Sequence, residues 1–417
     1  MVKIGNKLYV KIGFIVLWLG IFNPVIRSFS QVSLRQTTGY DKNIFRDDQG
    51  IADWTHQTSF TAVKKFVFVQ MEWDVAYNGQ AIWFNQHTDR FFHVHQFDTQ
   101  ANIQLPHQIS LENSFVYDQR FNKDDYTLYE YRNWRLSPQL HFLHFQQTPL
   151  VVGYYLRQRH YNELDYLNYT EQNAFFTIKH FFPTRTTVIA NINLYWKNYS
   201  ASTEDQQVII QRKAQSPDGG SGNAGGGHGH GQPHGPTDPL SPQEMMMDTL
   251  ITTIHQTQQR STQRWEASVR IAQSLTNSTG LRFDWTGQYA SDTPIRYLSG
   301  QEYNYTDDDE LYDNPYNYNG NSWEVMITQL LPLSFQLKCF ANTSQRRYNY
   351  SPEDMTTNRK DDELIFGVDV NKSFALPLLG LRTNLTVSYQ YIKNESNDYY
   401  FDYAFPLIFV SAQFTRN

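Results

Sequence analysis

The chain has 417 residues, of which 16% are aromatic and 18% charged, and Cys339 is its single cysteine. One cysteine excludes an internal disulfide bond and a zinc site built on cysteines. The leader described next holds four of the 35 basic residues, so the rest of the chain has 31 basic against 41 acidic residues and a net charge near −10. Such a charge excludes nucleic acid as an expected partner.

The first 30 residues have the pattern of a secretory signal peptide. Lys3, Lys7 and Lys11 form a basic start, and an apolar run of eleven residues follows over 12–22. That run is too short to cross a bilayer as a helix, which takes about 20 residues. Because Ser28-Phe29-Ser30 offers small residues for cleavage, we predict a signal peptide over 1–30.

Residues 31–58 are polar, contain turn residues and precede the first long alternating segment. We predict that they form a periplasmic segment or a plug in the lumen of a barrel over 59–417. If they hold a hairpin instead, the number of strands given below rises by two.

The segment 171–199 shows the repeating unit of the chain. Ala174, Phe176 and Ile178 alternate with polar residues, and after the FPTRT corner a second arm alternates in the same way. A period of two indicates β-strands with one apolar and one polar face. The polar face is too rich in Asn, Gln, Thr and Arg for a dry core, so we predict a transmembrane β-barrel, although a mean hydropathy of −0.59 also suits a soluble, aromatic-rich β-protein.

The same pattern recurs and predicts an all-β, antiparallel up-and-down barrel of about 14 strands, or 16 with the hairpin above. Short corners alternate with long, polar loops, which in barrels lie on the periplasmic and outer sides respectively. We therefore expect both termini in the periplasm and the long loops at the cell surface. The predicted strands are Ser59–Tyr77, Phe91–Leu105, Ile109–Tyr117, Leu128–Phe145, Leu150–Tyr161, the two arms of 171–199, Arg264–Leu275, Leu281–Tyr289, Trp323–Leu330, Phe335–Thr343, Glu363–Phe374, Leu381–Tyr391 and Tyr399–Phe414.

Two loops carry weak metal candidates. The Gly/His/Pro-rich stretch 214–243 is predicted to be a disordered extracellular loop, and its His228, His230 and His234 could chelate Zn, Cu or Ni weakly. Asp307 and Asp309 belong to an acidic run that could hold Ca²⁺, although its spacing is not that of an EF-hand. Incidental histidines and a solvated acidic loop are the favoured explanations of the two patterns, so we expect no cofactor.

No catalytic motif stands out. The sequence lacks GxSxG, HExxH and a phosphate-binding loop, so we expect no enzyme activity. His93 and His95 share the strand parity of Phe97, which places them on the lipid side near a strand end.

The inward faces carry charges of both signs. Such a mixed ladder can brace a closed barrel or line a wet pore, and both interpretations stay open. Phe66, Phe68, Tyr155, Phe175 and Phe340 are also predicted to point inward and to narrow the pore. The predicted lumen-lining residues are Lys64, Glu72, Asp74, Glu112, Arg157, Lys179, Arg264, Glu266, Arg270, Arg282, Asp284, Glu324, Lys338, Glu363, Asp369 and Arg382.

The segment GYDKNIFRD (Gly39–Asp47), followed by hairpins like 171–199, resembles Gram-negative outer-membrane barrels of the Bacteroidota kind. This combination of segment and hairpins is similar to exopolysaccharide-locus porins and to the barrel half of surface lipoprotein assembly modifiers. The resemblance implies an outer-membrane location.

We predict an outer-membrane channel that passes small solutes. The alternative is a non-conducting barrel that acts in surface binding or in export and assembly of surface molecules. Expected partners are outer-membrane lipid and lipopolysaccharide, small solutes and the barrel-assembly machinery.

Overall fold

The computed structural model describes residues 30–44, 50–143, 147–163, 165, 168–200, 206–212, 248–254, 261–291, 316, 318–348, 357–376 and 380–416. The chain divides into two units, one formed by Met1–Glu204 with Gln256–Asn417 and one by Asp205–His255. Apart from Ser30, the predicted signal peptide lies outside the described residues, and so does the stretch 214–243.

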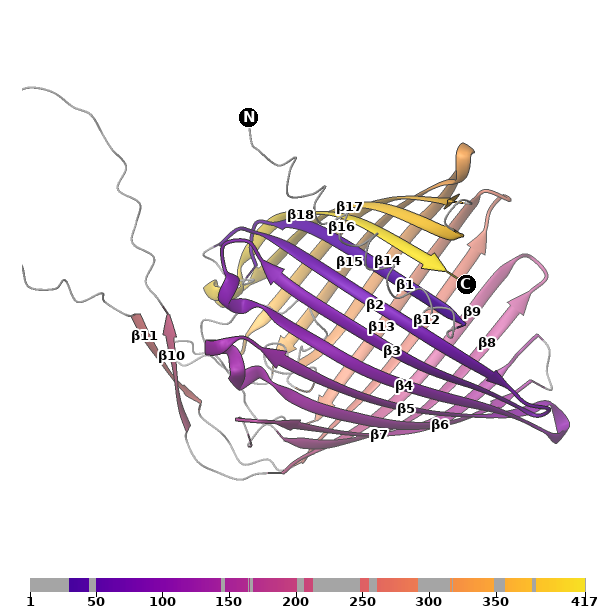
Figure 1. The fold of residues 1–417 in the computed structure, drawn as a ribbon, viewed down its shortest axis with the longest axis horizontal. Helices are drawn as coiled ribbons and strands as arrows, with labels where there is room; N and C mark the ends of the chain where they lie inside the picture. Colours follow the sequence, from indigo (N-terminus) through magenta and orange to yellow (C-terminus); the bar gives the residue numbers. More distant parts are fainter. Residues whose placement is uncertain are drawn as a thin grey trace, which may run out of the picture. The chain divides into compact units, whose positions relative to one another are not determined.

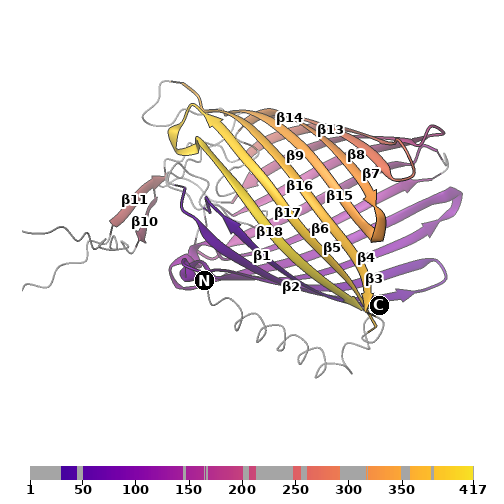
Figure 2. The ribbon, with the colours of Figure 1, turned by 90° about the horizontal axis from the view of Figure 1, so that it is seen from above.

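The larger unit contains a closed antiparallel barrel in which each strand pairs with its neighbours in chain order (Figure 1). The first and last strands complete the ring, with a register that runs from Val32 opposite Arg416 to Asp41 opposite Leu407. Figure 2 shows these two strands side by side. The 16 strands are β1 (Gln31–Asp41), β2 (Asp53–Val67), β3 (Met71–Phe84), β4 (Phe92–Leu105), β5 (Ile109–Asn122), β6 (Tyr131–Phe142), β7 (Leu150–Tyr161), β8 (Tyr169–Phe182), β9 (Thr186–Tyr199), β12 (Ser261–Ser274), β13 (Thr279–Ser291), β14 (Tyr318–Leu331), β15 (Phe335–Tyr348), β16 (Lys360–Leu376), β17 (Leu381–Ser396) and β18 (Tyr403–Arg416).

The predicted all-β up-and-down barrel is confirmed, but its N-terminal part differs from the prediction. Residues 31–41 and 53–58 belong to wall strands rather than to a periplasmic segment or a plug. Ser59–Tyr77 is two strands, because the chain reverses between Val67 and Met71. The reversal was missed because residues 68–70 read Phe-Val-Gln and contain none of the Gly, Pro, Asn or Asp residues that usually mark a turn.

The connections alternate in length as predicted. The corner end, where β1 begins and β18 ends, carries short connections such as 68–70, 106–108, 183–185 and 332–334. Non-glycine residues take left-handed backbone angles there, among them Arg185 (φ 62°) and Leu333 (φ 60°). The opposite, loop end carries the longer connections. Short 3₁₀ turns are η1 (Thr88–Arg90), η2 (Pro106–Gln108), η3 (Asp124–Tyr129), η5 (Pro332–Ser334) and η7 (Tyr399–Phe401).

The smaller unit is an antiparallel hairpin of β10 (Gln206–Arg212) and β11 (Asp248–Ile254). Its pairing runs from Gln206 opposite Ile254 to Arg212 opposite Asp248. In the sequence it lies between β9 and β12, and therefore in a connection of the loop end.

The outer face of the barrel wall carries mainly apolar side chains and the inner face mainly polar ones, because successive residues of a strand point to opposite faces. On β16 and β17 the outward Phe366 and Val387 are more than one third exposed, whereas inward Asp361 and Asn394 are buried. Large exposed apolar side chains follow the outward parity around the ring, including Phe176, Ile192, Val325 and Ile408. Among the described residues no helix is long and apolar enough to cross a membrane.

Candidate functional site

The inner face of the barrel is the candidate site, because it collects most of the polar side chains that alternate with the apolar outer face. Residues directly opposite each other on paired strands share a face, so the register carries the inner parity around the ring. It places 15 of the 16 predicted lumen residues on the inner face. They are Glu72, Asp74, Glu112, Arg157, Lys179, Arg264, Glu266, Arg270, Arg282, Asp284, Glu324, Lys338, Glu363, Asp369 and Arg382.

Lys64 is the exception, and the corner at 68–70 explains it. Lys65, not Lys64, lies opposite Asp74 on the inner face, and its Nζ lies 2.6 Å from Glu72 Oε2. Because the corner has three residues, the inward side chains are the odd-numbered ones on β2 and the even-numbered ones on β3. An alternation continued straight through the corner therefore assigns the residues of β2 to the wrong face. For the same reason Phe66 faces outward, beside Trp73, and Phe68 lies in the corner itself.

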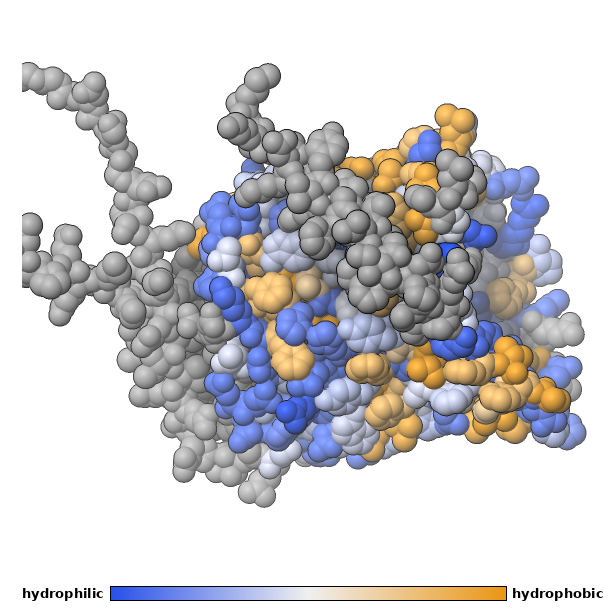
Figure 3. Space-filling model, viewed as in Figure 1, coloured by the Kyte–Doolittle hydropathy of each residue, from blue (hydrophilic) through white to orange (hydrophobic). Residues whose placement is uncertain are grey.

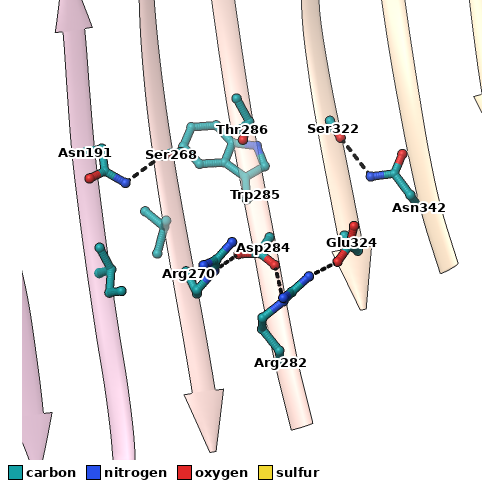
Figure 4. A pocket seen from close by; sticks show the side chains of 12 residues that line it. Asn191, Ser268, Arg270, Arg282, Asp284, Trp285, Thr286, Ser322, Glu324 and Asn342 are labelled. Carbon is teal, nitrogen blue, oxygen red and sulfur yellow. Dashed lines mark hydrogen bonds and ion pairs between the residues drawn. The ribbon is translucent and has the colours of Figure 1, made fainter. Parts of the chain in front are cut away.

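A recess of about 290 Å³ opens in the inner wall over β9 and β12–β15. At one side of it, four charged groups form a ladder in which Arg270 pairs with Asp284, and Arg282 pairs with both Asp284 and Glu324 (Figure 4). Two positive and two negative groups leave this ladder without net charge. Arg270 is 48% and Arg282 30% exposed, so water reaches the ladder and each pair contributes about 1 kcal/mol at most to stability.

Neutral amides and hydroxyls line the rest of the recess. Asn191 Nδ2 donates to Ser268 Oγ at 3.0 Å, and Asn342 Nδ2 donates to Ser322 Oγ at 3.2 Å (Figure 4). Thr177 Oγ1 donates to Asn191 Oδ1 at 2.8 Å, which extends the row to β8. These groups can bind water or a hydroxylated or ionic solute equally well.

Charge is unevenly distributed around the inner face. Strands β3–β5 carry an acidic sector, and β6–β9 carry a basic sector. At their boundary Asn133 Nδ2 donates to Asp118 Oδ1 at 2.7 Å, while Arg157 Nε donates to Asn133 Oδ1 at 2.9 Å. The acidic sector contains Glu72, Asp74, Asp98, Glu112 and Asp118 beside one inward arginine, Arg120, and the basic sector contains Arg135, Arg157, Arg159, Lys179 and Lys197 beside one inward carboxylate, Glu171.

Three inward phenylalanine rings lie over glycines of the neighbouring strand. Phe175 lies opposite Gly153, Phe340 opposite Gly367 and Phe409 opposite Gly39. A Cβ added to any of these glycines would come within 2.1–2.2 Å of the ring. The rings therefore lie against the wall and occupy less of the lumen than inward phenylalanines would if they extended from it.

The loop end of the inner face is packed differently and forms what we call the mouth tier. Here basic side chains are buried over aromatic rings, an arrangement in which the ring replaces part of the water around the cation. Lys197 lies 3.8 Å from the centre of the Tyr169 ring, and Arg159 lies 4.0 Å from that of Tyr131. The other members are Arg90 with Phe84, Arg120 with Phe92, Arg264 with Tyr195, and Arg359 with Tyr348 and Phe401.

The mouth tier was not predicted, although the sequence carries a signal for it. A basic residue stands two positions before a tyrosine at the loop end of two strands, in RHY (159–161) and KNY (197–199), and in both the cation lies over that tyrosine as well. Residues two apart share a face of a strand, so the repeat places cation and ring side by side.

Two loop residues dock inside this mouth. Ile44, from the β1–β2 connection, is buried against Ile82, Phe84 and Phe92. Tyr316, which precedes β14, is buried with its ring centre 6.5 Å from that of Tyr195 and 5.2 Å from the Arg264 guanidinium. The connections before β2 and before β14 thus each reach the inner wall.

The remaining candidates do not form a site among the described residues. His228, His230, His234, Asp307 and Asp309 lie outside them. Within the described part of the chain no group of three or more His, Cys, Asp or Glu residues could hold a metal ion. His93 and His95 point outward on β4, with their rings 5.0 Å apart.

No family model and no curated protein matches the chain. Solved structures similar to it include a bacterial polysaccharide outer membrane secretin, at 10% identity and a TM-score of 0.44, covering 93% of this chain and 98% of the other. OpdK of Pseudomonas aeruginosa with vanillate is similar at 10% identity and a TM-score of 0.47, covering 92% and 98%. OccAB4 of Acinetobacter baumannii is similar at 9% identity and 0.45, covering 93% and 97%. Because these TM-scores are below 0.5, the similarities do not indicate a function, which has to be inferred from the geometry of the lumen.

Proposed function

We propose that this protein is a porin-like channel of the outer membrane that passes small polar solutes through the barrel lumen. The observation that carries the proposal is the wet middle of the inner face, where the charged ladder and the amides around it stay accessible to water. A closed structural core would bury and pair such groups, because an unpaired buried charge is costly. Porins of about 16–18 strands enclose an aqueous channel, whereas a barrel of about eight strands has room for side chains or one small ligand.

The orientation follows from the lengths of the connections. Short corners lie at the periplasmic side in barrels of this kind, and long loops at the outer side. Both termini then lie in the periplasm, and the mouth tier faces the cell exterior. The apolar outer face would contact outer-membrane lipid and lipopolysaccharide, and the barrel-assembly machinery would insert the chain.

The acidic and basic sectors suggest how solutes would be selected. Opposite charges on neighbouring parts of one wall orient a dipolar or ionic solute without imposing a strong preference for one sign. Ile44 and Tyr316 reduce the opening at the mouth. We therefore expect a small conductance with weak ion selectivity.

Conductance of the purified protein in planar lipid bilayers tests the proposal. We expect discrete steps that scale with salt concentration. A correctly folded protein that never conducts would refute the proposal and favour the second candidate.

That second candidate is a non-conducting barrel that acts in surface binding or in export and assembly of surface molecules. The observation that favours it is the mouth tier, whose dry packing with Ile44 and Tyr316 could close the lumen. Conductance measured before and after both residues are replaced with alanine distinguishes the two functions, because a channel would conduct in its native form and more in the variant, whereas a barrel closed by the mouth tier would be silent in its native form.

A further inference from the structure

Outward aromatic side chains form a row across the wall on β3–β6, toward the loop end. The register places these residues directly opposite one another on successive strands. In membrane barrels, aromatic residues gather where the outer wall passes from hydrocarbon to the lipid headgroups. The row therefore marks one edge of the apolar band. We call it the aromatic row, and its residues are Tyr77, Phe97, Tyr117 and Trp134.

The corner end is the other edge of the apolar band. From the aromatic row to the corner, the stretches 97–105 on β4, 109–117 on β5 and 134–142 on β6 have nine residues each. A transmembrane β-strand takes about 9–11 residues, so these stretches suffice to cross the hydrocarbon. All three strands continue beyond the aromatic row, and this part of the wall lies at the level of the lipid headgroups. Figure 3 shows this side of the barrel with hydrophilic residues toward the loop end and hydrophobic residues toward the corner end, where its atoms are not grey.

Polar side chains with open hydrogen-bond donors follow directly beyond the aromatic row on β5–β7. Gln119, Arg132 and His160 lie opposite one another in the register, and we call them the headgroup row. Arg132 and His160 are exposed, and neither side chain has an ion-pair or hydrogen-bond partner among the described residues. Tyr117 Oη donates to Gln119 Oε1 at 3.3 Å, which leaves the amide N–H groups of Gln119 available. The headgroup row can therefore donate several hydrogen bonds to one acceptor group.

The wall around the headgroup row offers its cation no carboxylate. The outward residues of β2–β9 are all described by the structure, and none of them is an aspartate or a glutamate. Glu130, which precedes β6, accepts hydrogen bonds from the Asn122 backbone N–H and from Asn162 Nδ2. Outward Arg347 on β15 differs, because it lies 3.6 Å from Asp362 on β16. The positive charge of the headgroup row is thus open to an anion from outside the chain.

We propose that the headgroup row binds a phosphate group of lipopolysaccharide in the outer leaflet. The proposal rests on the orientation given above, in which the loop end faces the exterior of the cell. Phosphate oxygens accept strong hydrogen bonds from arginine, and imidazole and amide N–H groups add to them. On β6 the exposed Leu136 and Leu140 follow toward the corner end and suit the acyl chains of the same molecule. A solute in the lumen cannot reach this row, because the barrel wall lies between them.

Binding of lipid A, the membrane anchor of lipopolysaccharide, tests the proposal with the whole protein in phospholipid nanodiscs. The native protein should bind diphosphorylated lipid A about tenfold more tightly than lipid A without its phosphates. Arg132→Gln combined with His160→Gln should remove most of this preference. The matched control is Arg347→Gln, which removes an outward arginine that already has a carboxylate partner and should keep the preference. Equal affinity of the native protein for both lipids, or an equal loss in the control, would overturn the proposal.

Two further measurements separate the possible sources of the phosphate. Inorganic phosphate should not displace bound lipid A, and displacement would mean that the row takes free phosphate instead. In nanodiscs taken directly from outer membranes, the native protein should carry lipopolysaccharide by mass and the double variant should carry less, while a heat-sensitive shift on a gel shows that both are folded. Equal retention would refute the proposal. Because the row lies outside the lumen, a protein that binds lipid A without conducting would refute the channel alone.

Discussion

The mouth tier and the middle of the lumen use the same charged residue types on the same face of the wall, with opposite results. Lys197 in the mouth tier is 0% exposed, lies over Tyr169 and stands opposite the buried Glu171. Arg270, about midway along β12, is 48% exposed and pairs with Asp284 in contact with water. The difference teaches that residue type alone does not separate a bracing charge from a lumen charge. Burial does, and burial depends on the aromatic residues around the charge.

The largest effect is expected in the mouth tier. Lys197→Ala removes a fully buried side chain from beside the Tyr169 and Tyr199 rings and leaves a cavity there, which should cost about 2–5 kcal/mol. Urea titration of the folded protein, followed by tryptophan fluorescence, should show this loss of unfolding free energy. The matched control is Arg270→Ala, which should change it by about 1 kcal/mol or less. Equal losses would remove the distinction between the two regions.

A second test compares the inner face with the outer face at the same level. Val368→Arg or Val387→Arg places a charge toward lipid and should destabilise the barrel by about 2–4 kcal/mol. Asn191→Arg and Thr386→Arg point inward and should fold normally. Ile192 and Val269 are further outward sites, whereas Val69 and Gln70 lie in the corner 68–70 and should tolerate arginine. Equal tolerance on both faces would contradict the membrane assignment.

Gly153→Val tests whether the flat ring of Phe175 keeps the lumen open. The added side chain would overlap the ring, which should cost about 1–3 kcal/mol and force the ring away from the wall. Conductance should fall, and the double variant Gly153→Val with Phe175→Ala should restore it. Unchanged conductance in the single variant would mean that the lumen is limited elsewhere.

Charge reversal in the middle of the lumen should change selectivity more than stability. Arg282→Glu converts the neutral ladder into one with a net negative charge, so the reversal potential in a salt gradient should shift toward cations. Arg382→Glu, also on the inner face, should act in the same direction. Arg264→Glu is no equivalent variant, because Arg264 lies in the mouth tier over Tyr195 and should fail to fold.

The smallest effect is expected from deleting residues 214–243. Their composition predicts a loop tip that contributes little stability, so the urea midpoint should not change. Protease added to whole cells should cut the native chain there first. Protection of this stretch in intact cells would mean that the corner end, not the loop end, faces the exterior.

The alternation of apolar and polar residues was sufficient to predict strands and the face of their side chains wherever a strand and its corner lie within one short segment. It predicted Leu150–Tyr161 to the residue, the hairpin of β8 and β9, and the inward side of Arg270, Asp284 and Asp369. The reason is that the face of a side chain depends on parity alone, which nearest neighbours in the sequence determine. Where an unmarked corner interrupts the parity, as at 68–70, the same reasoning misplaced Lys64 and Phe66.

Closure and the mouth tier depend on tertiary structure. The polar alternation of residues 31–41 does not show that β1 pairs with β18 until both ends of the chain are placed together. Arg359 meets Phe401, and Arg264 meets Tyr195 and Tyr316, from segments far apart in the sequence. Away from the unmarked corner at 68–70, the sequence by itself determined which side chains point inward. Burial is a property of the completed ring, so only the closed barrel decided which of the inward charges are buried and which are in contact with water.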